Sequence, residues 1–202
     1  MTEITADVVK KLRAATGAGM MDCKKALQET GGDMDKAVEY LRKKGAATAA
    51  KRADRETNQG VVEAYVHAGG RIGSMVELNC ETDFVAKTPE FKALAHDLAM
   101  QIAAMNPRYV TKEQVDKAVI DKELEIYRTQ AQNEGKPANI AEKIALGRLD
   151  KFYQEICLME QSFIKDSGKT IRDLIDEATA KVGEKVSVRR FMRYHLGEDN
   201  AG

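Results

Sequence analysis

The chain has 202 residues, 43% of them hydrophobic, which suffices for one medium domain or for a small domain attached to a larger one. Its 32 basic and 32 acidic side chains cancel, and this balance argues against a nucleic-acid-binding protein, which usually carries a basic excess. No apolar run approaches the ~18 residues that span a bilayer, no signal peptide opens the chain, and the three cysteines suit a reducing compartment. We therefore expect a cytoplasmic protein without a membrane segment.

Residues 1–45 are expected to form a compact unit of three short helices. Gly17-Ala18-Gly19 and Gly31-Gly32 separate the helices, and Asp33 is a suitable N-cap for the third, which we expect to end at Gly45. The residues expected on the inner faces of the three helices are Val8, Val9, Leu12, Ala15, Cys23, Ala26, Leu27, Met34, Ala37, Val38 and Leu41. So small a core is marginal, and such a unit is more often a docking module than an active site.

Residues 46–59 carry almost no apolar stripe, which predicts a solvated linker with some helical character. From Gly60 the hydrophobic period changes from that of a helix to two. Alternating runs at 61–67 and 72–78 flank Ala68-Gly69-Gly70-Arg71, and this combination indicates a β-hairpin.

The stretch from Leu78 to Pro89 connects the hairpin to the next helix. Thr88 and Pro89 suit the N-cap and the first helical position, so the connection before them is tight. A large apolar side chain, Phe84, lies in this turn. It either folds back into its own core, as isolated loop aromatics usually do, or projects toward a partner.

A long helical hairpin is predicted in the second half of the chain, after a helix at 89–105. Thr111-Lys112-Glu113-Gln114 is a capping box that opens a polar helix running to about Asn133. Gly135-Lys136-Pro137 turns the chain, and a second long helix runs from about Asn139 to Leu158. Two long helices with so short a turn form an antiparallel pair, here an arm at about 112–157 whose distal part we expect to protrude as a coiled coil.

One more helix follows Thr170 and ends at Gly183, and Val186–Leu196 has the pattern of a strand. Residues 197–202 are expected to form a frayed tail.

The predicted fold class is therefore α+β. The three-helix unit and the linker precede a core at 60–196, which contains an antiparallel sheet of three strands, helices on one face and the inserted arm. Such a sheet leaves its edges unpaired, and a second copy of the chain is one way to cover them.

Residues with catalytic or ligand-binding chemistry show no productive spacing. Ser167-Gly168-Lys169-Thr170 imitates the end of a phosphate-binding loop, but the full pattern needs a glycine where this chain has Phe163, so we expect a turn into a helix cap. The histidines and cysteines show no ligand spacing, and Cys80 is expected to be a small buried residue. We predict no metal, no cofactor and no enzyme activity, and therefore a binding protein.

Met20 and Met21 follow Gly19 at the start of the second predicted helix. Two flexible thioethers suit an adaptable hydrophobic binding surface, while the alternative is that both pack inside the three-helix unit. We expect one to be buried and leave open whether the other faces a partner together with the edge of Leu12.

Four segments in the order of this chain resemble elongation factor Ts, the nucleotide exchange factor of the translational GTPase elongation factor Tu. They are Thr16–Leu27, Asn79–Lys87, Gly135–Pro137 with Ile140–Ile144 and Gly147-Arg148, and the strand around Arg189–Tyr194. The first two are long and specific. Longer family members carry two α/β repeats in the core, whereas one is visible here, so the chain resembles the short form, which suggests a homodimer.

The resemblance implies a ubiquitin-associated type of three-helix module that docks on the nucleotide-binding domain of the GTPase through Leu12, Met20 and Met21. It also implies that Asp83 and Phe84, in the segment Thr82-Asp83-Phe84-Val85, intrude beside the GTPase's magnesium and phosphate site. Under this resemblance Phe84 points outward.

We therefore expect a guanine nucleotide exchange factor that binds the GDP form of elongation factor Tu and releases GDP so that GTP can bind. Three alternatives stay open: an adaptor that holds its partner without exchange, a thiol enzyme using Cys80, and an RNA-binding protein acting through the arm. The mixed charges of the arm argue against the last.

Overall fold

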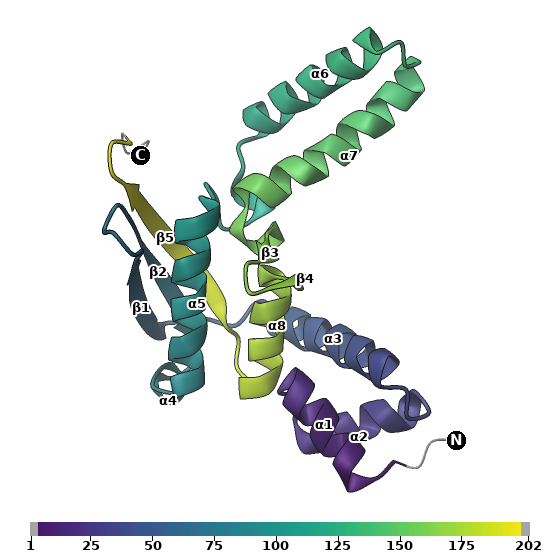
Figure 1. The fold of residues 1–202 in the computed structure, drawn as a ribbon, viewed down its shortest axis with the longest axis vertical. Helices are drawn as coiled ribbons and strands as arrows, with labels where there is room; N and C mark the ends of the chain where they lie inside the picture. The colour runs from purple at the N-terminus through teal and green to yellow at the C-terminus, as the bar shows by residue number, and fades with distance from the viewer. Residues whose placement is uncertain (1–3, 199–202) are drawn as a thin grey trace. The chain divides into compact units, whose positions relative to one another are not determined.

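The computed structural model describes residues 4–198, so most of the tail predicted at 197–202 lies outside the described part. Its helices and antiparallel sheets confirm the α+β class, and β1, β2 and β5 form a three-stranded sheet in the order β1-β2-β5 (Figure 1). The helices are α1 (Ala6–Thr16), α2 (Met20–Glu29), α3 (Met34–Lys51), α4 (Asp83–Ala86), α5 (Pro89–Met105), η1 (Lys112–Gln114), α6 (Lys117–Asn133), α7 (Ala138–Ile156), η2 (Leu158–Glu160) and α8 (Ile171–Val182). The strands are β1 (Gln59–Val66), β2 (Ile72–Cys80), β3 (Ser162–Phe163), β4 (Asp166–Thr170) and β5 (Ser187–His195).

The chain divides into two compact units. The first unit comprises residues 1–62, 77–95 and 173–188, and the second comprises 63–76, 96–172 and 189–202. The strands of the main sheet and α5 contribute residues to both. Each unit is described below by itself.

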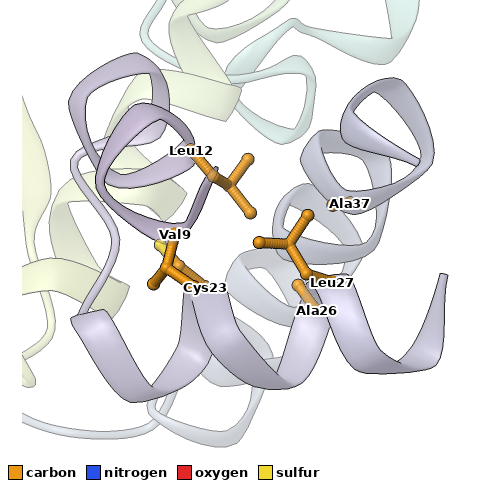
Figure 2. Packing of buried hydrophobic residues seen from close by; sticks show 6 residues of the cluster. All are labelled: Val9, Leu12, Cys23, Ala26, Leu27 and Ala37. Carbon is orange, nitrogen blue, oxygen red and sulfur yellow. The ribbon is translucent and has the colours of Figure 1, made fainter. Parts of the chain in front are cut away.

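In the first unit, α1, α2 and α3 enclose a small apolar core (Figure 2). Its buried members are Val9, Leu12, Cys23, Ala26, Leu27 and Ala37. The third helix begins as its cap predicts: Asp33 Oδ1 accepts a hydrogen bond from Lys36 N at 3.1 Å and starts α3. Two residues that we expected on inner faces, Ala15 and Val38, are exposed instead.

The third helix does not end at Gly45, as the sequence suggested, but continues to Lys51. Gly45 is buried within it, and a Cβ added to Gly45 would lie 3.7 Å from the Asp176 carbonyl oxygen on α8. Arg42, also on α3, forms a bidentate pair with Asp173 on α8. The alanine-rich stretch after Gly45 has high helix propensity, and packing against α8 offsets the cost of one glycine. The beginning of the predicted linker is therefore helical.

In the second unit, α6 and α7 pack along each other (Figure 1). Arg128 pairs with Glu142, and Arg148 Nη1 donates to Gln130 Oε1 at 2.7 Å. The first of these helices, α6, starts at Lys117 and not at the capping box Thr111–Gln114, because the box closes only the 3-10 turn η1 and Val115 is extended. Val115 is instead buried at the base of the helical pair with Ile156 and Cys157.

The second unit also contains a short antiparallel hairpin, β3–β4, that the sequence did not reveal. The stretch Ser167–Thr170, expected as a turn into a helix cap, is part of β4. Gln101 holds this hairpin from α5: its Nε2 donates to Gln161 Oε1 at 3.2 Å and to Ser162 O at 3.1 Å, and its Oε1 accepts from Ile164 N at 2.9 Å.

Candidate functional site

The connection between β2 and α5 in the first unit forms the single helical turn α4, with Thr82 as its N-cap residue. Ala86 is buried and Val85 half-buried, while the Phe84 side chain is 87% exposed. A one-turn helix can turn only part of its circumference toward the core, and here that part carries Ala86. The structure thus places Phe84 outward, the orientation that the resemblance implied and that spacing alone disfavoured.

Thr82 is held by Glu184, which follows α8. Its backbone N–H donates to Glu184 Oε2 at 2.9 Å, and its hydroxyl donates to Glu184 Oε1 at 2.6 Å. Hydrogen bonds to an ionised carboxylate are short and about twice as strong as neutral ones. The residue that opens α4 is therefore fixed through both its backbone and its side chain.

Glu81, one position earlier, is held by a backbone N–H and by two arginines. Its Oε1 accepts from Lys185 N at 2.6 Å and from Arg52 Nη1 at 3.3 Å, and its Oε2 accepts from Arg55 Nη1 at 2.9 Å. The Lys185 backbone N–H, followed by Arg55 and Arg52, lowers the pKa of the Glu81 carboxyl. Lys185 Nζ also donates to Ala53 O at 2.6 Å and to Arg55 O at 2.9 Å, beyond the end of α3.

Sequence reasoning did not identify Glu81, Glu184 or the arginines that follow α3. Glu184 lies 102 positions from Thr82, and no spacing rule relates residues that far apart. Glu81 lies in Asn79–Lys87, one of the segments that carry the family resemblance, but the resemblance implied no role for it.

Asp83 and Cys80 lie on either side of Thr82 in the same connection. Asp83 Oδ2 pairs on the surface with Lys87 Nζ at 2.5 Å. The Cys80 thiol is buried and donates to Thr82 O at 3.1 Å, and burial, together with the Glu184 carboxylate, raises its pKa. A buried thiol that stays protonated is a poor nucleophile, which argues against a thiol enzyme.

The start of α2 presents the two methionines on the surface of the three-helix unit. Met21 is 73% exposed and Met20 is 39% exposed, so both lie outside the core and the expectation that one of them is buried was wrong. Leu12 is 0% exposed and packs in the core (Figure 2), a position that disfavours the docking contact that the resemblance implied. The exposed docking candidates are therefore Met20 and Met21.

The main sheet has one apolar face exposed in the second unit. Ser74 Oγ donates to Ala99 O at 2.6 Å and Arg193 Nε donates to Ala103 O at 3.1 Å, so α5 covers the face that these two residues share. Successive residues of a strand point to opposite faces. The opposite face carries exposed apolar side chains of this unit, which are Val66 on β1, Met75 on β2, Met192 and Tyr194 on β5, and Leu196 after β5.

Among the described residues, no three His, Cys, Asp or Glu side chains are placed to hold a metal ion. The histidines pair singly with other groups, His96 Nδ1 lying 3.0 Å from Glu63 Oε1 and His195 Nδ1 lying 2.7 Å from Glu198 Oε1. Within residues 4–198, no helix is both long and apolar enough to cross a membrane.

Comparisons with known proteins agree over nearly the whole chain. A family model described as elongation factor TS matches residues 2–198. The elongation factor Ts of Desulforamulus reducens is 62% identical over 198 residues, covering 98% of this chain and 91% of that protein. That of Moorella thermoacetica is 63% identical over 195 residues, covering 96% of each chain, and that of Carboxydothermus hydrogenoformans is 62% identical over 195 residues, covering 96% of this chain and 90% of the relative.

Proposed function

The chain belongs to the elongation factor Ts family, the nucleotide exchange factors of elongation factor Tu in translation elongation, and we propose that it releases GDP by pressing its Asp83-Phe84 loop into the magnesium and phosphate site of that GTPase. The observation that carries this proposal is the 87% exposure of Phe84, at the tip of a turn whose preceding residues are anchored.

The exposed ring of Phe84 is apolar surface whose burial in a partner would favour association. Burying its ring in a partner's pocket would contribute about 1.5–3 kcal/mol. The factor and the nucleotide then weaken each other's binding to the GTPase by the same coupling free energy, of which each ~1.4 kcal/mol is a tenfold change in nucleotide affinity. The role of the ring is to displace the groups that hold magnesium and phosphate. Thr82 and Val85 flank the Asp83-Phe84 pair and contact the same site on the GTPase.

Docking is assigned to the three-helix module, residues 1–45, which we take to be of the ubiquitin-associated type. Met20 and Met21 are its exposed thioethers, and flexible side chains of this kind adapt to a partner's surface. The linker at 46–59, helical as far as Lys51, joins it to the core at 60–196, from which the arm, at about 112–157, extends as a coiled coil. The factor breaks no bond, uses no cofactor and acts in the cytoplasm, without direct nucleic-acid binding.

A homodimer is the second part of the proposal. The apolar sheet face opposite α5 carries five exposed apolar side chains in the second unit (Val66, Met75, Met192, Tyr194 and Leu196), and contiguous patches of this kind mark interfaces. A second copy presents the same self-complementary surface and covers it.

The test of the wedge is GDP release from elongation factor Tu loaded with a fluorescent GDP, with the full-length chain added in excess. Phe84→Ala should reduce the maximal stimulated release rate by about tenfold or more, while binding to the GTPase is retained through the docking module. Ile126→Ala is the matched control, because it truncates an exposed apolar side chain away from the loop, on α6. This variant should stimulate GDP release at the same rate as the unsubstituted chain.

Normal release by Phe84→Ala would overturn the wedge. Complex formation without faster release by the unsubstituted chain would favour the adaptor alternative, and unchanged release by Cys80→Ala is the result expected from a buried, protonated thiol.

A further inference from the structure

We infer that the turn between α8 and β5, residues 183–186, positions the Phe84 loop and joins it to the end of α3, with Glu81 and Glu184 as the positioning residues. The inference rests on the proposed function of Phe84 and adds to it the groups that set the direction of the ring.

One short turn reaches three parts of the first unit. Glu184 takes both donors of Thr82, the Lys185 backbone N–H binds Glu81, and Lys185 Nζ binds the carbonyls of Ala53 and Arg55. Gly183 ends α8 with φ +73°, a left-handed conformation that glycine adopts without strain, and this lets the chain reverse at that point. The two residues immediately before Asp83-Phe84 are thereby tied to a rigid helix end.

The loop needs such support because α4 cannot supply it. A helix of four residues is far shorter than one that is stable alone, and only Ala86 of α4 is buried. A flexible loop would lose conformational entropy when it enters a pocket, and ordering it beforehand removes that cost. The two carboxylates order it through Glu81 and Thr82, the residues that precede Asp83.

The residues that follow α3 also connect the docking module to the Phe84 loop. Arg52 and Arg55 follow the helix that forms the third side of the docking module, and both contact Glu81. The Glu81 side chain is only 19% exposed, so these contacts are screened less than those of a surface pair.

Titrating each variant against elongation factor Tu separates positioning from docking. Glu184→Ala should lower the maximal rate of GDP release about fivefold while changing the half-saturating concentration by less than about twofold. Met21→Lys should do the reverse, raising the half-saturating concentration at a nearly unchanged maximal rate. Asp97→Asn, which removes the pair of Asp97 with Lys165 in the second unit, is the matched control for lost charge and should change neither.

A double-mutant cycle tests whether Glu184 acts through the ring. In a Phe84→Ala background, Glu184→Ala should have no further effect on the release rate, because a group that only aims the ring has nothing left to aim. A full additional fivefold loss would show a role independent of Phe84 and overturn the inference. Glu184→Gln keeps the size of the side chain and one acceptor, so it should give a smaller effect of the same sign and carries the test if the alanine variant does not fold.

A spectroscopic readout is independent of exchange. The chain contains no tryptophan, so Phe84→Trp introduces a single probe at the tip of the loop. Adding Glu184→Ala or Glu81→Gln should lower the fluorescence anisotropy of that tryptophan in the full-length chain, and Asp97→Asn should leave it unchanged. Unchanged anisotropy in both glutamate variants would overturn the inference while leaving the wedge intact, whereas normal GDP release by Phe84→Ala would overturn both.

Discussion

Gly60, the second residue of β1, lies against the backbone of β2. A Cβ at this position would approach the Leu78 carbonyl oxygen to 2.2 Å and the Asn79 Cα to 2.8 Å, distances at which the backbone must move. We predict that Gly60→Ala lowers the free energy of unfolding by about 2–4 kcal/mol, as overpacking against rigid atoms does. Urea denaturation of the two proteins measures the difference.

Gly45 is the matched control, because it is also a glycine within a regular element of the first unit. Its Cβ would lie 3.7 Å from Asp176 O and 3.9 Å from Ala180 Cβ, which are ordinary contacts. Since alanine has the higher helix propensity, Gly45→Ala should raise the free energy of unfolding by about 0.5–1 kcal/mol. Equal losses in both variants would contradict the steric account.

Cys157 illustrates how burial controls thiol chemistry in the second unit. Burial, and to a lesser degree the charge of Glu160, raises its pKa to about 11. The reactive thiolate forms as the pH rises through the pKa, so at pH 8 only about one molecule in a thousand carries it. We predict negligible alkylation of Cys157 by iodoacetamide at pH 8 in the native protein and rapid alkylation in urea, measured by mass spectrometry. Fast labelling of the folded chain would show an accessible thiolate and refute this.

The direction of single side chains was the least predictable feature of the site. Spacing placed Phe84 in a turn but favoured burial, and its exposure follows from α4, a helical turn in which Ala86 takes the inward position. Leu12 lies inward, as helical periodicity predicts, and fills the core. Its docking role stays a prediction that this burial disfavours.

At the scale of elements, one predicted helix start and one predicted helix end were wrong: the capping box at Thr111 does not open α6, and Gly45 does not end α3. Asp33 starts α3 as expected, and Thr88 Oγ1 accepts from Phe91 N at 3.3 Å at the start of α5. Gly45 did not end α3, because it lies in a right-handed helix with favourable residues after it and α8 beside it. Local sequence does not contain that tertiary contact.

The β3–β4 hairpin depends on one buried amide. Gln101 on α5 is fully buried, and a Gln101→Leu substitution would leave Gln161 Oε1, Ser162 O and Ile164 N without these partners. Each buried polar group that loses its hydrogen bond costs about 1–3 kcal/mol. Thus we predict a loss of about 3 kcal/mol in the free energy of unfolding, measured in urea.

Gln130→Leu makes the same chemical change at an exposed position of α6, where the amide accepts a hydrogen bond from Arg148. A surface substitution of this kind should change the free energy of unfolding by about 0.5 kcal/mol or less. Comparable losses in the two variants would mean that the buried network does not hold the hairpin.

At the scale of the whole molecule, the sequence supported the class of the fold but not its long-range contacts. The β1–β2 hairpin, the helical arm and the late strand followed from periodicity and turn residues. The pairing of Glu184 with Thr82 and the latch of Gln101 connect distant segments, and neither leaves a local signal. The first anchors the functional loop and the second holds the β3–β4 hairpin, so structure was needed to find these supports.

The apolar sheet face gives the prediction that concerns two chains. Met75 on β2 and Met192 on β5 are exposed on this face, and lysine at both positions would place like charges across a two-fold interface and desolvate them. We predict that the Met75→Lys, Met192→Lys double variant sediments as a monomer at concentrations at which the unsubstituted chain is a dimer. Analytical ultracentrifugation measures this directly.

Met21→Lys places the same charge on the docking module, outside the proposed interface, and should leave the sedimentation of the dimer unchanged while weakening binding to elongation factor Tu. If the sheet-face variant remained dimeric, the copies would meet elsewhere. If Met21→Lys also produced monomers, the docking module itself would form part of the dimer contact, and the two surfaces could not act independently.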